Sequence, residues 1–153
     1  MKITYCTEWS LFRKQPYHIL SESDAKEKHI NGEPYVVVIY EAEDVINVIE
    51  IDENSLTVRF YNDKFENYLL YGFVKKDNRL FLNMVYHYLY NNGEEVEQIL
   101  FNFKDTGELF MERSNNVSKE VEQREAVVDV TCNWEEFPQF GNYFGIIRIE
   151  REK

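Results

Sequence analysis

Apolar and polar residues alternate with a period of two along most of the chain, which is typical of half-buried β-strands. Leu56, Val58 and Phe60, for example, alternate with Ser55, Thr57, Arg59 and Tyr61. The strands predicted from this period cover residues 2–8, 35–41, 44–51, 55–61, 67–76, 79–91, 94–104, 108–113, 117–132 and 143–150, and the segment 117–132 is long enough for two strands.

The breaks between these runs consist of Asn, Asp and Gly, which tolerate the positive φ of tight hairpin turns. They include residues 52–54, 62–63, 76–78, 91–93, 105–107 and 114–116. Short strands joined by short turns predict an antiparallel meander. Since strand twist accumulates in so long a sheet, we expect a barrel or a curled half-barrel. The fold class is therefore mainly β, in one domain over residues 1–153.

A short helical insertion is expected after the first strand, within residues 10–31. Ser21 or Ser23 can cap a helix that runs through residues 24–28 and stops at Asn31-Gly32. A further helical turn is expected before Pro16.

The longest alternating run predicts one strand with two distinct faces. One face is expected to hold Leu80, Leu82, Met84, Tyr86, Tyr88 and Tyr90, and the other Phe81, Asn83, Val85, His87 and Leu89. Tyrosines in such a row serve as packing residues or as interface residues, because the ring gives rigid area and the hydroxyl a polar tip.

The composition adds a strong acidic bias. The 153 residues include 17 basic and 28 acidic side chains, for a formal net charge of −11. This balance argues against a nucleic-acid partner, since phosphate binding needs clustered Lys and Arg. The longest mainly apolar run, residues 34–40, is far below the ~20 residues of a membrane span, so we expect no membrane partner and a cytoplasmic location.

The acidic residues gather in separate stretches of the chain. The candidate partner-binding residues are Glu41, Glu43 and Asp44, then Glu94, Glu95 and Glu97, then Glu120 and Glu122. Such clusters either keep strand ends solvated or steer a cationic partner onto an acidic surface. The sequence alone does not place them next to one another.

Catalytic signatures are missing from the sequence. His18, His29 and His87 form no zinc-binding spacing, and there is neither a G-x-S-x-G motif nor a glycine-rich phosphate loop. Cys6 and Cys132 are expected to be partly buried thiols within strands. We therefore predict a protein that is not an enzyme and that uses no cofactor and no metal.

The order of a first strand, a short helical segment and an antiparallel meander resembles the intracellular fatty-acid-binding proteins. That resemblance implies a small apolar ligand inside a barrel, gripped through its carboxylate by an arginine near the C-terminus. Arg148 stands in the matching region, with Glu150 where the family has a tyrosine. A carrier of a small apolar ligand is therefore the alternative function.

The chain also resembles the immunity proteins of bacterial contact-dependent inhibition and other polymorphic toxin systems. The likeness is one of type: a small acidic β-protein, rich in Tyr, Asn and Glu, without a catalytic signature. The resemblance implies a cognate basic toxin or nuclease as the partner, blocked by steric occlusion. The acidic residues named above are then the expected contacts, and this is the favoured function.

Overall fold

The computed structural model describes residues 1–151, and more than half of them lie in strands. The strands are β1 (Lys2–Ser10), β2 (Gln15–Leu20), β3 (Tyr35–Glu41), β4 (Asp44–Ile51), β5 (Ser55–Tyr61), β6 (Asn67–Lys76), β7 (Arg79–Asn91), β8 (Glu94–Phe103), β9 (Glu108–Asn115), β10 (Val121–Val127) and β11 (Trp134–Glu136). The helices are α1 (Glu22–Ile30) and α2 (Phe144–Ile147), with a 3-10 turn, η1 (Thr131–Asn133). The last two residues of the predicted domain, 152–153, lie outside the described part.

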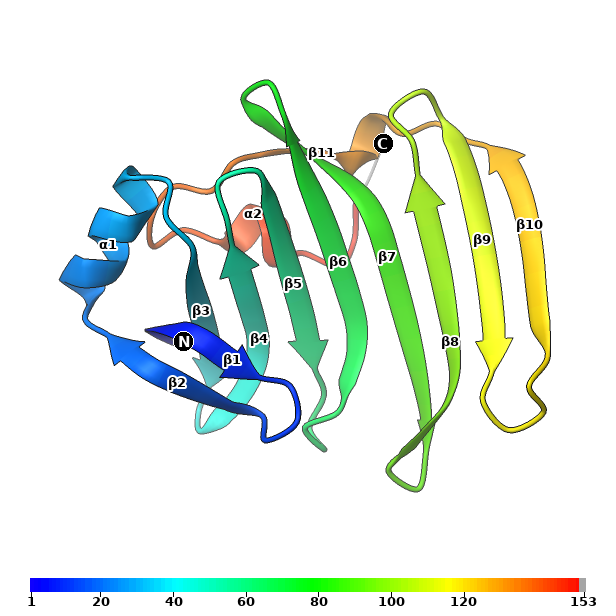
Figure 1. Cartoon of the computed structure of the whole chain (residues 1–153), viewed down its shortest axis with the longest axis horizontal. Coiled ribbons are helices and arrows are strands. Elements are labelled where there is room, and N and C mark those ends of the chain that lie inside the picture. Colours follow the sequence, from blue (N-terminus) through cyan, green and yellow to red (C-terminus); the bar gives the residue numbers. More distant parts are fainter. Residues whose placement is uncertain (152–153) are drawn as a thin grey trace.

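The strands form one antiparallel sheet in the order β10-β9-β8-β7-β6-β5-β4-β3-β1-β2, and β11 pairs with the beginning of β7. Each strand from β3 to β10 pairs with the next along the chain, which confirms the predicted meander. The sheet curls without closing, because β10 and β2 remain as its two edges (Figure 1). Of the two predicted shapes, the open curled sheet forms and the closed barrel does not.

Strands β3 to β7 begin and end where the sequence predicted, because the turn residues between them take up the tight turns. Asp77 (φ 57°), Asn92 (φ 52°) and Gly93 (φ 81°) all adopt positive φ. Helix α1 also matches its prediction: the Ser21 side chain accepts a 3.0 Å hydrogen bond from the Asp24 backbone N–H. Its predicted glycine stop is Gly32, at φ 69°.

The segment before α1 is a hairpin, so the helical turn predicted before Pro16 is wrong. Ser10 ends β1, and after a four-residue turn Pro16 lies within β2, at the edge of the sheet. Proline is tolerated on an edge strand because its missing N–H needs no partner there. The short strand and its proline also protect this edge from pairing with another chain.

The C-terminal part of the chain differs from its prediction at more positions. Only residues 121–127 of the expected 117–132 segment form a strand, and Cys132 lies in η1. The expected strand at 143–150 is replaced by the short helix α2. Ile146 is buried within α2 and Tyr143 is buried as its N-cap; the two are three positions apart, which is the spacing of one helix face. An almost continuously apolar run fits either period, so the sequence pattern could not distinguish the two.

The main core lies on the face of β3–β7 that is covered by α1 and by residues 131–147, which we call the inner face. Tyr35, Phe73, Ala25 and Ile146 are among its most deeply buried residues. In Figure 1 the C-terminal segment runs behind the sheet, with α2 behind β4 and β5. This cover extends over only part of the sheet, and β8–β10 project beyond it as an uncovered extension (Figure 1).

A smaller core lies on the opposite face, which we call the outer face. Here the β1–β2 hairpin folds over β3–β5, and Trp9 packs with Val38, Val48 and Tyr61. In Figure 1 this hairpin lies in front of the sheet, while β6–β10 have nothing in front of them. The outer face is therefore covered at one end of the sheet and open at the other.

A β-bulge in β7 divides the faces differently from the prediction. Phe73 pairs with Leu82 and Gly72 with Met84, so Asn83 is the extra residue. Leu80 and Leu82 consequently point into the inner core, whereas Met84, Tyr86 and Tyr88 lie on the outer face. The single six-residue face predicted from alternation is therefore wrong, because one extra residue reverses every side chain beyond it.

Candidate functional site

The predicted acidic residues come together at one end of the sheet. In an antiparallel meander every second turn lies at the same end, and the β3–β4, β5–β6, β7–β8 and β9–β10 turns share the lower end in Figure 1. We call this end the acidic edge and define it by Glu41, Glu43, Asp44, Glu94, Glu95, Glu97, Glu120 and Glu122. The β5–β6 turn adds Asp63 and Glu66, which were not predicted, together with Lys64, and the β9–β10 turn holds Lys119, so the edge carries two cations among its carboxylates.

The acidic edge is wide. Five neighbour-to-neighbour steps separate β4 from β9, which corresponds to about 24 Å at the usual strand spacing. Within residues 1–151 no group of three His, Cys, Asp or Glu side chains is arranged to hold a metal ion. A row of carboxylates of this width suits a macromolecular surface better than a small ion.

At the β3–β4 turn the carboxylates have no basic partner. Among the described residues, no ion pair within 4.0 Å involves Glu41, Glu43 or Asp44. Glu43 and Asp44 line a small cleft of about 140 Å³ with Asp63 and Phe65. The charges at this end of the row are therefore available to a cation from outside.

At the β8–β10 end the carboxylates are partly engaged. Arg113 donates from Nε to Glu97 Oε1 and, at 3.0 Å, from Nη2 to Glu97 Oε2. This bidentate hydrogen bonding is the main reason that the pKa of Glu97 lies below its usual value. Asn116 Nδ2 donates to Glu95 Oε2 at 3.1 Å and ties the β9–β10 turn to β8. Glu97 is thus a structural carboxylate.

A row of tyrosines lies beside the acidic edge, on the outer face. The Tyr86 and Tyr88 rings stack with centroids 5.6 Å apart and planes 7° apart. Next along β7, the Tyr90 hydroxyl donates a 2.8 Å hydrogen bond to the Asn67 carbonyl. Burial raises the pKa of Tyr90 to about 12, and the nearby Glu95 and Glu66 charges add to this effect. The tyrosine row and the acidic edge are therefore continuous.

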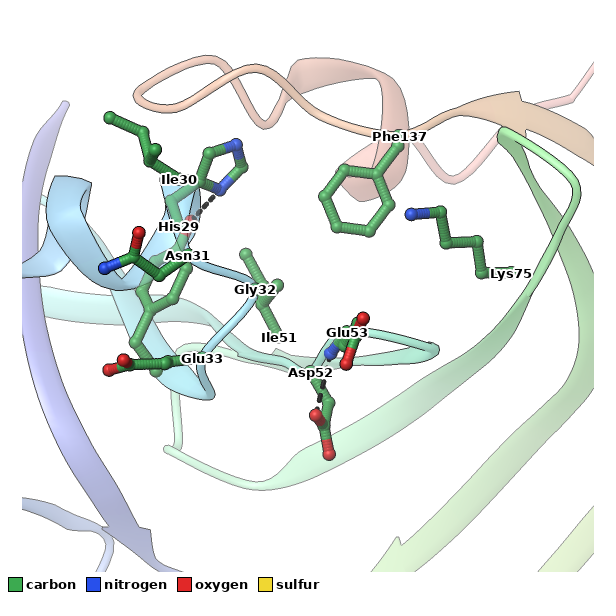
Figure 2. A pocket seen from close by; sticks show the side chains of 11 residues that line it. His29, Ile30, Asn31, Gly32, Glu33, Ile51, Asp52, Glu53, Lys75 and Phe137 are labelled. Atoms are coloured by element: carbon green, nitrogen blue, oxygen red, sulfur yellow. Dashed lines mark hydrogen bonds between the residues drawn. The ribbon is translucent and has the colours of Figure 1, made fainter.

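A separate pocket of about 280 Å³ lies at the opposite end of the sheet, between α1, the β4–β5 turn and Phe137 (Figure 2). Its wall includes His29, whose Nδ1 lies 2.8 Å from the Tyr35 hydroxyl. Burial lowers the pKa of His29. Lys75 Nζ lies 5.1 Å from the centre of the Phe137 ring, and Glu53 lies below that ring in the view of Figure 2. These groups can hold a small polar molecule, and the sequence analysis did not detect them because they come from four distant segments.

Arg148, the residue matched to the ligand-binding arginine, forms an ion pair. Its Nη2 lies 2.8 Å from Glu135 Oε2, and Arg151 Nη1 lies 3.1 Å from the same oxygen. Arg148 also lines a mostly apolar cleft of about 390 Å³ beside α2, together with Phe60 and Phe144. The arginine therefore borders an open cleft at the surface, since no barrel interior forms.

Comparison with protein-family models, with curated protein sequences and with solved structures finds no match for this chain. Among the helices of residues 1–151, none has both the length and the apolar character needed to cross a membrane.

Proposed function

We propose that this protein is an immunity-type inhibitor that binds a basic protein toxin or nuclease and blocks it by steric occlusion. The observation that carries the proposal is the convergence of the acidic clusters at one end of the sheet, on alternate hairpin turns. Stretches up to about 80 residues apart in sequence thereby form one negative edge, and the carboxylates at its β3–β4 turn have no basic partner within 4.0 Å in the described part of the chain.

The chemistry of a nuclease supports this pairing. An enzyme that holds a phosphate backbone presents clustered Lys and Arg around its active site. A row of carboxylates complements that surface and steers the two proteins into contact, which raises the association rate. The net charge of −11 acts in the same direction. A sheet that is held by its own core can then cover the active site without rearranging.

The experiment is a binding measurement with the purified product of the gene immediately upstream, at low and at physiological salt. Two triple variants are compared: Glu41→Lys/Glu43→Lys/Asp44→Lys and Glu94→Lys/Glu95→Lys/Glu120→Lys. We expect association with the wild type to slow as salt rises, because screening shortens the field to ~8 Å at physiological ionic strength. Each triple variant should weaken binding at least tenfold.

The matched control reverses three exposed carboxylates outside the acidic edge, in Glu27→Lys/Glu53→Lys/Glu136→Lys. It changes the net charge by the same amount and should affect binding far less. Absence of binding to the upstream product, or binding that ignores salt and both edge variants, would show that the acidic edge only keeps the protein soluble.

A second candidate, a carrier of a small apolar ligand, is favoured by the cleft beside α2. Phe60, Phe144, Ile147 and Ile149 supply its apolar wall. Arg148 lines this cleft and shares the carboxylate of Glu135 with Arg151, so it can contact a ligand carboxylate, although Glu41 lines the same cleft. An apolar fluorescent probe should then bind and be displaced by a fatty acid. Binding that survives Arg148→Gln as well as the control Arg124→Gln would argue against this site.

A further inference from the structure

The outer face of β6–β9 exposes a patch that is unusually apolar for an uncovered sheet. Its side chains are Leu70, Met84, Tyr86, Tyr88, Leu100 and Phe110, all of them half-buried and neighbours by strand pairing. We call this patch the tyrosine face. Within the described part of the chain, the β1–β2 hairpin covers only β3–β5, so nothing packs over these residues (Figure 1).

The patch includes one glycine position that has little room for a side chain. Gly72 lies opposite Met84, and a Cβ at Gly72 would come within 3.3 Å of the Met84 Cβ. The stacked rings of Tyr86 and Tyr88 lie next to this glycine position and are held parallel, 7° apart. Rigid aromatic area with little side-chain entropy to lose is what the centre of a protein interface requires.

The charges on this face select the kind of partner. The carboxylates of Glu95, Glu112 and Glu125 lie around the patch, and none of them has a basic partner within 4.0 Å among residues 1–151. Glu112 accepts only a neutral hydrogen bond, from Gln123 Nε2 at 3.2 Å. Phe110 and Glu125 also line a cleft of about 350 Å³, whose one cation, Lys104, is paired with Glu108, so the ring and the carboxylate of Glu125 remain for a guanidinium group.

Four basic side chains at or beside the outer face of β5–β8 are already engaged. Arg59 is paired with Glu50, Lys76 with Asp105 and Lys104 with Glu108. Arg79, at the far end of β7, lies 5.1 Å from the centre of the Trp134 ring. The face therefore presents apolar area with a negative rim, which repels a second copy of this acidic chain and attracts a basic surface.

The inner face of the same strands has a different character. Arg113 and Arg124 lie on it together with Glu97 and Glu122, so its charges balance, while Phe101 and Phe103 pack against the main core. Leu89, next to Tyr88 on the strand, points to this inner side and is 42% exposed. The two faces of β7–β10 thus differ in charge, and only the outer one matches a cationic partner.

We infer that the tyrosine face is the docking surface for a basic protein, with the Tyr86–Tyr88 stack as the desolvated centre and the acidic edge as the steering rim. This inference rests on the proposed function and gives the two surfaces different roles. The acidic edge sets the association rate, and the tyrosine face sets the lifetime of the complex. Buried aromatic anchors act mainly on dissociation, whereas rim charges act mainly on association.

The test measures association and dissociation rates against the product of the upstream gene, by surface plasmon resonance at several salt concentrations. Tyr86→Ala/Tyr88→Ala should speed dissociation at least tenfold and leave the salt dependence of association unchanged. Tyr88→Arg, which keeps a long side chain and adds a positive charge, should have an effect at least as large. The matched controls are Leu89→Ala and Leu89→Arg, at the adjacent position on the opposite face, and should bind within twofold of wild type. Thermal melting verifies that each variant is folded.

The outcomes separate the two proposals. If the acidic-edge variants weaken binding while the tyrosine variants bind like wild type, the docking surface is wrong and the proposed function stands. If the upstream product does not bind the wild type at all, both fall. Sedimentation of the protein alone supplies a further check: a dimer that Tyr88→Arg dissociates would show that a second copy covers the face, and would overturn the inference.

Discussion

The indole Nε1 of Trp9 donates a 3.1 Å hydrogen bond to the hydroxyl of Tyr61, although the two residues are 52 positions apart in sequence. Both side chains are buried, and burial raises the pKa of Tyr61. The contact fastens the β1–β2 hairpin over the outer face of β3–β5 and so determines how much of that face remains open.

Removing this bond should loosen the hairpin. Tyr61→Phe deletes only the hydroxyl and leaves the indole N–H buried without its acceptor, so we expect a loss of about 1–3 kcal/mol in the free energy of unfolding. Tyr86→Phe is the matched control, since the Tyr86 hydroxyl makes no hydrogen bond among the described residues, and it should unfold like wild type. Urea denaturation measures both, and equal midpoints for the two variants would contradict the prediction.

Stability should depend on pH through His29. Burial lowers the pKa of this imidazole in the folded state, so the unfolded chain binds more protons as the pH falls through the ordinary value of about 6.5. The stabilisation is therefore complete above that pH and is lost below it. We expect the melting temperature of wild type to drop between pH 7.5 and pH 5.5, and the drop to be smaller in His29→Gln.

His87 needs its own variant in that experiment, because burial lowers its pKa as well. The Nδ1 of His29 lies at hydrogen-bond distance from Tyr35 and its ring packs against Phe137 and Phe140. The ring of His87 packs edge-on against Phe101, 5.8 Å between centroids. An identical pH profile for wild type and His29→Gln would show that His29 does not contribute.

The beginning of α1 depends on one of two neighbouring serines. The Ser21 side chain satisfies the Asp24 N–H, whereas Ser23 lies inside the first turn of the helix. Ser21→Ala should cost about 1 kcal/mol in the free energy of unfolding, as is usual for loss of an N-cap. Ser23→Ala should be neutral within ~0.5 kcal/mol, because alanine has the higher helix propensity. Chemical denaturation of both variants checks this. A larger loss in Ser23→Ala than in Ser21→Ala would show that Ser23, and not Ser21, caps the helix.

Two turn glycines differ in what surrounds them. Gly107 has φ 101°, and a Cβ there would lie 2.8 Å from the Val128 carbonyl oxygen. Gly93 has φ 81° with no atom within 4 Å of its Cβ position. Gly93→Ala should cost about 1 kcal/mol, from the backbone conformation alone. Gly107→Ala should cost about 2–3 kcal/mol, because the backbone must also move. Thermal unfolding should rank the two variants in this order.

The sheet was predictable wherever alternation and turn chemistry agree. Between Ser55 and Asn91 the alternating runs end at Asn or Asp, and the strands follow that pattern; β3 instead is an almost continuous apolar run that ends just before Ala42, which adopts φ 54°. Around Pro16 the same reasoning failed, since proline is compatible with an edge strand as well as with a helix stop. The strand predicted at 143–150 failed for another reason, because this mostly apolar run fits the period of a helix as well as that of a strand.

The candidate site was predictable only in part. The carboxylates themselves are obvious in the sequence, but their convergence depends on which turns lie at the same end of the sheet. That is known only when every strand has been placed correctly. The position of Tyr86 and Tyr88 depends further on the bulge at Asn83, which local alternation does not reveal. Glu97 shows a third limit, because its neutralisation by Arg113 depends on the register between β8 and β9.

Placing the acidic edge on alternate hairpin turns has an evolutionary consequence. Each turn belongs to its own pair of strands and contributes little to either core, so its residues can mutate one hairpin at a time while the sheet persists. A lineage can therefore change the charge and shape of this edge by stepwise drift at the turns, without passing through unstable intermediates. A repertoire of related chains would then share one invariant scaffold and differ mainly at a few loop tips, much as antibody variable domains do.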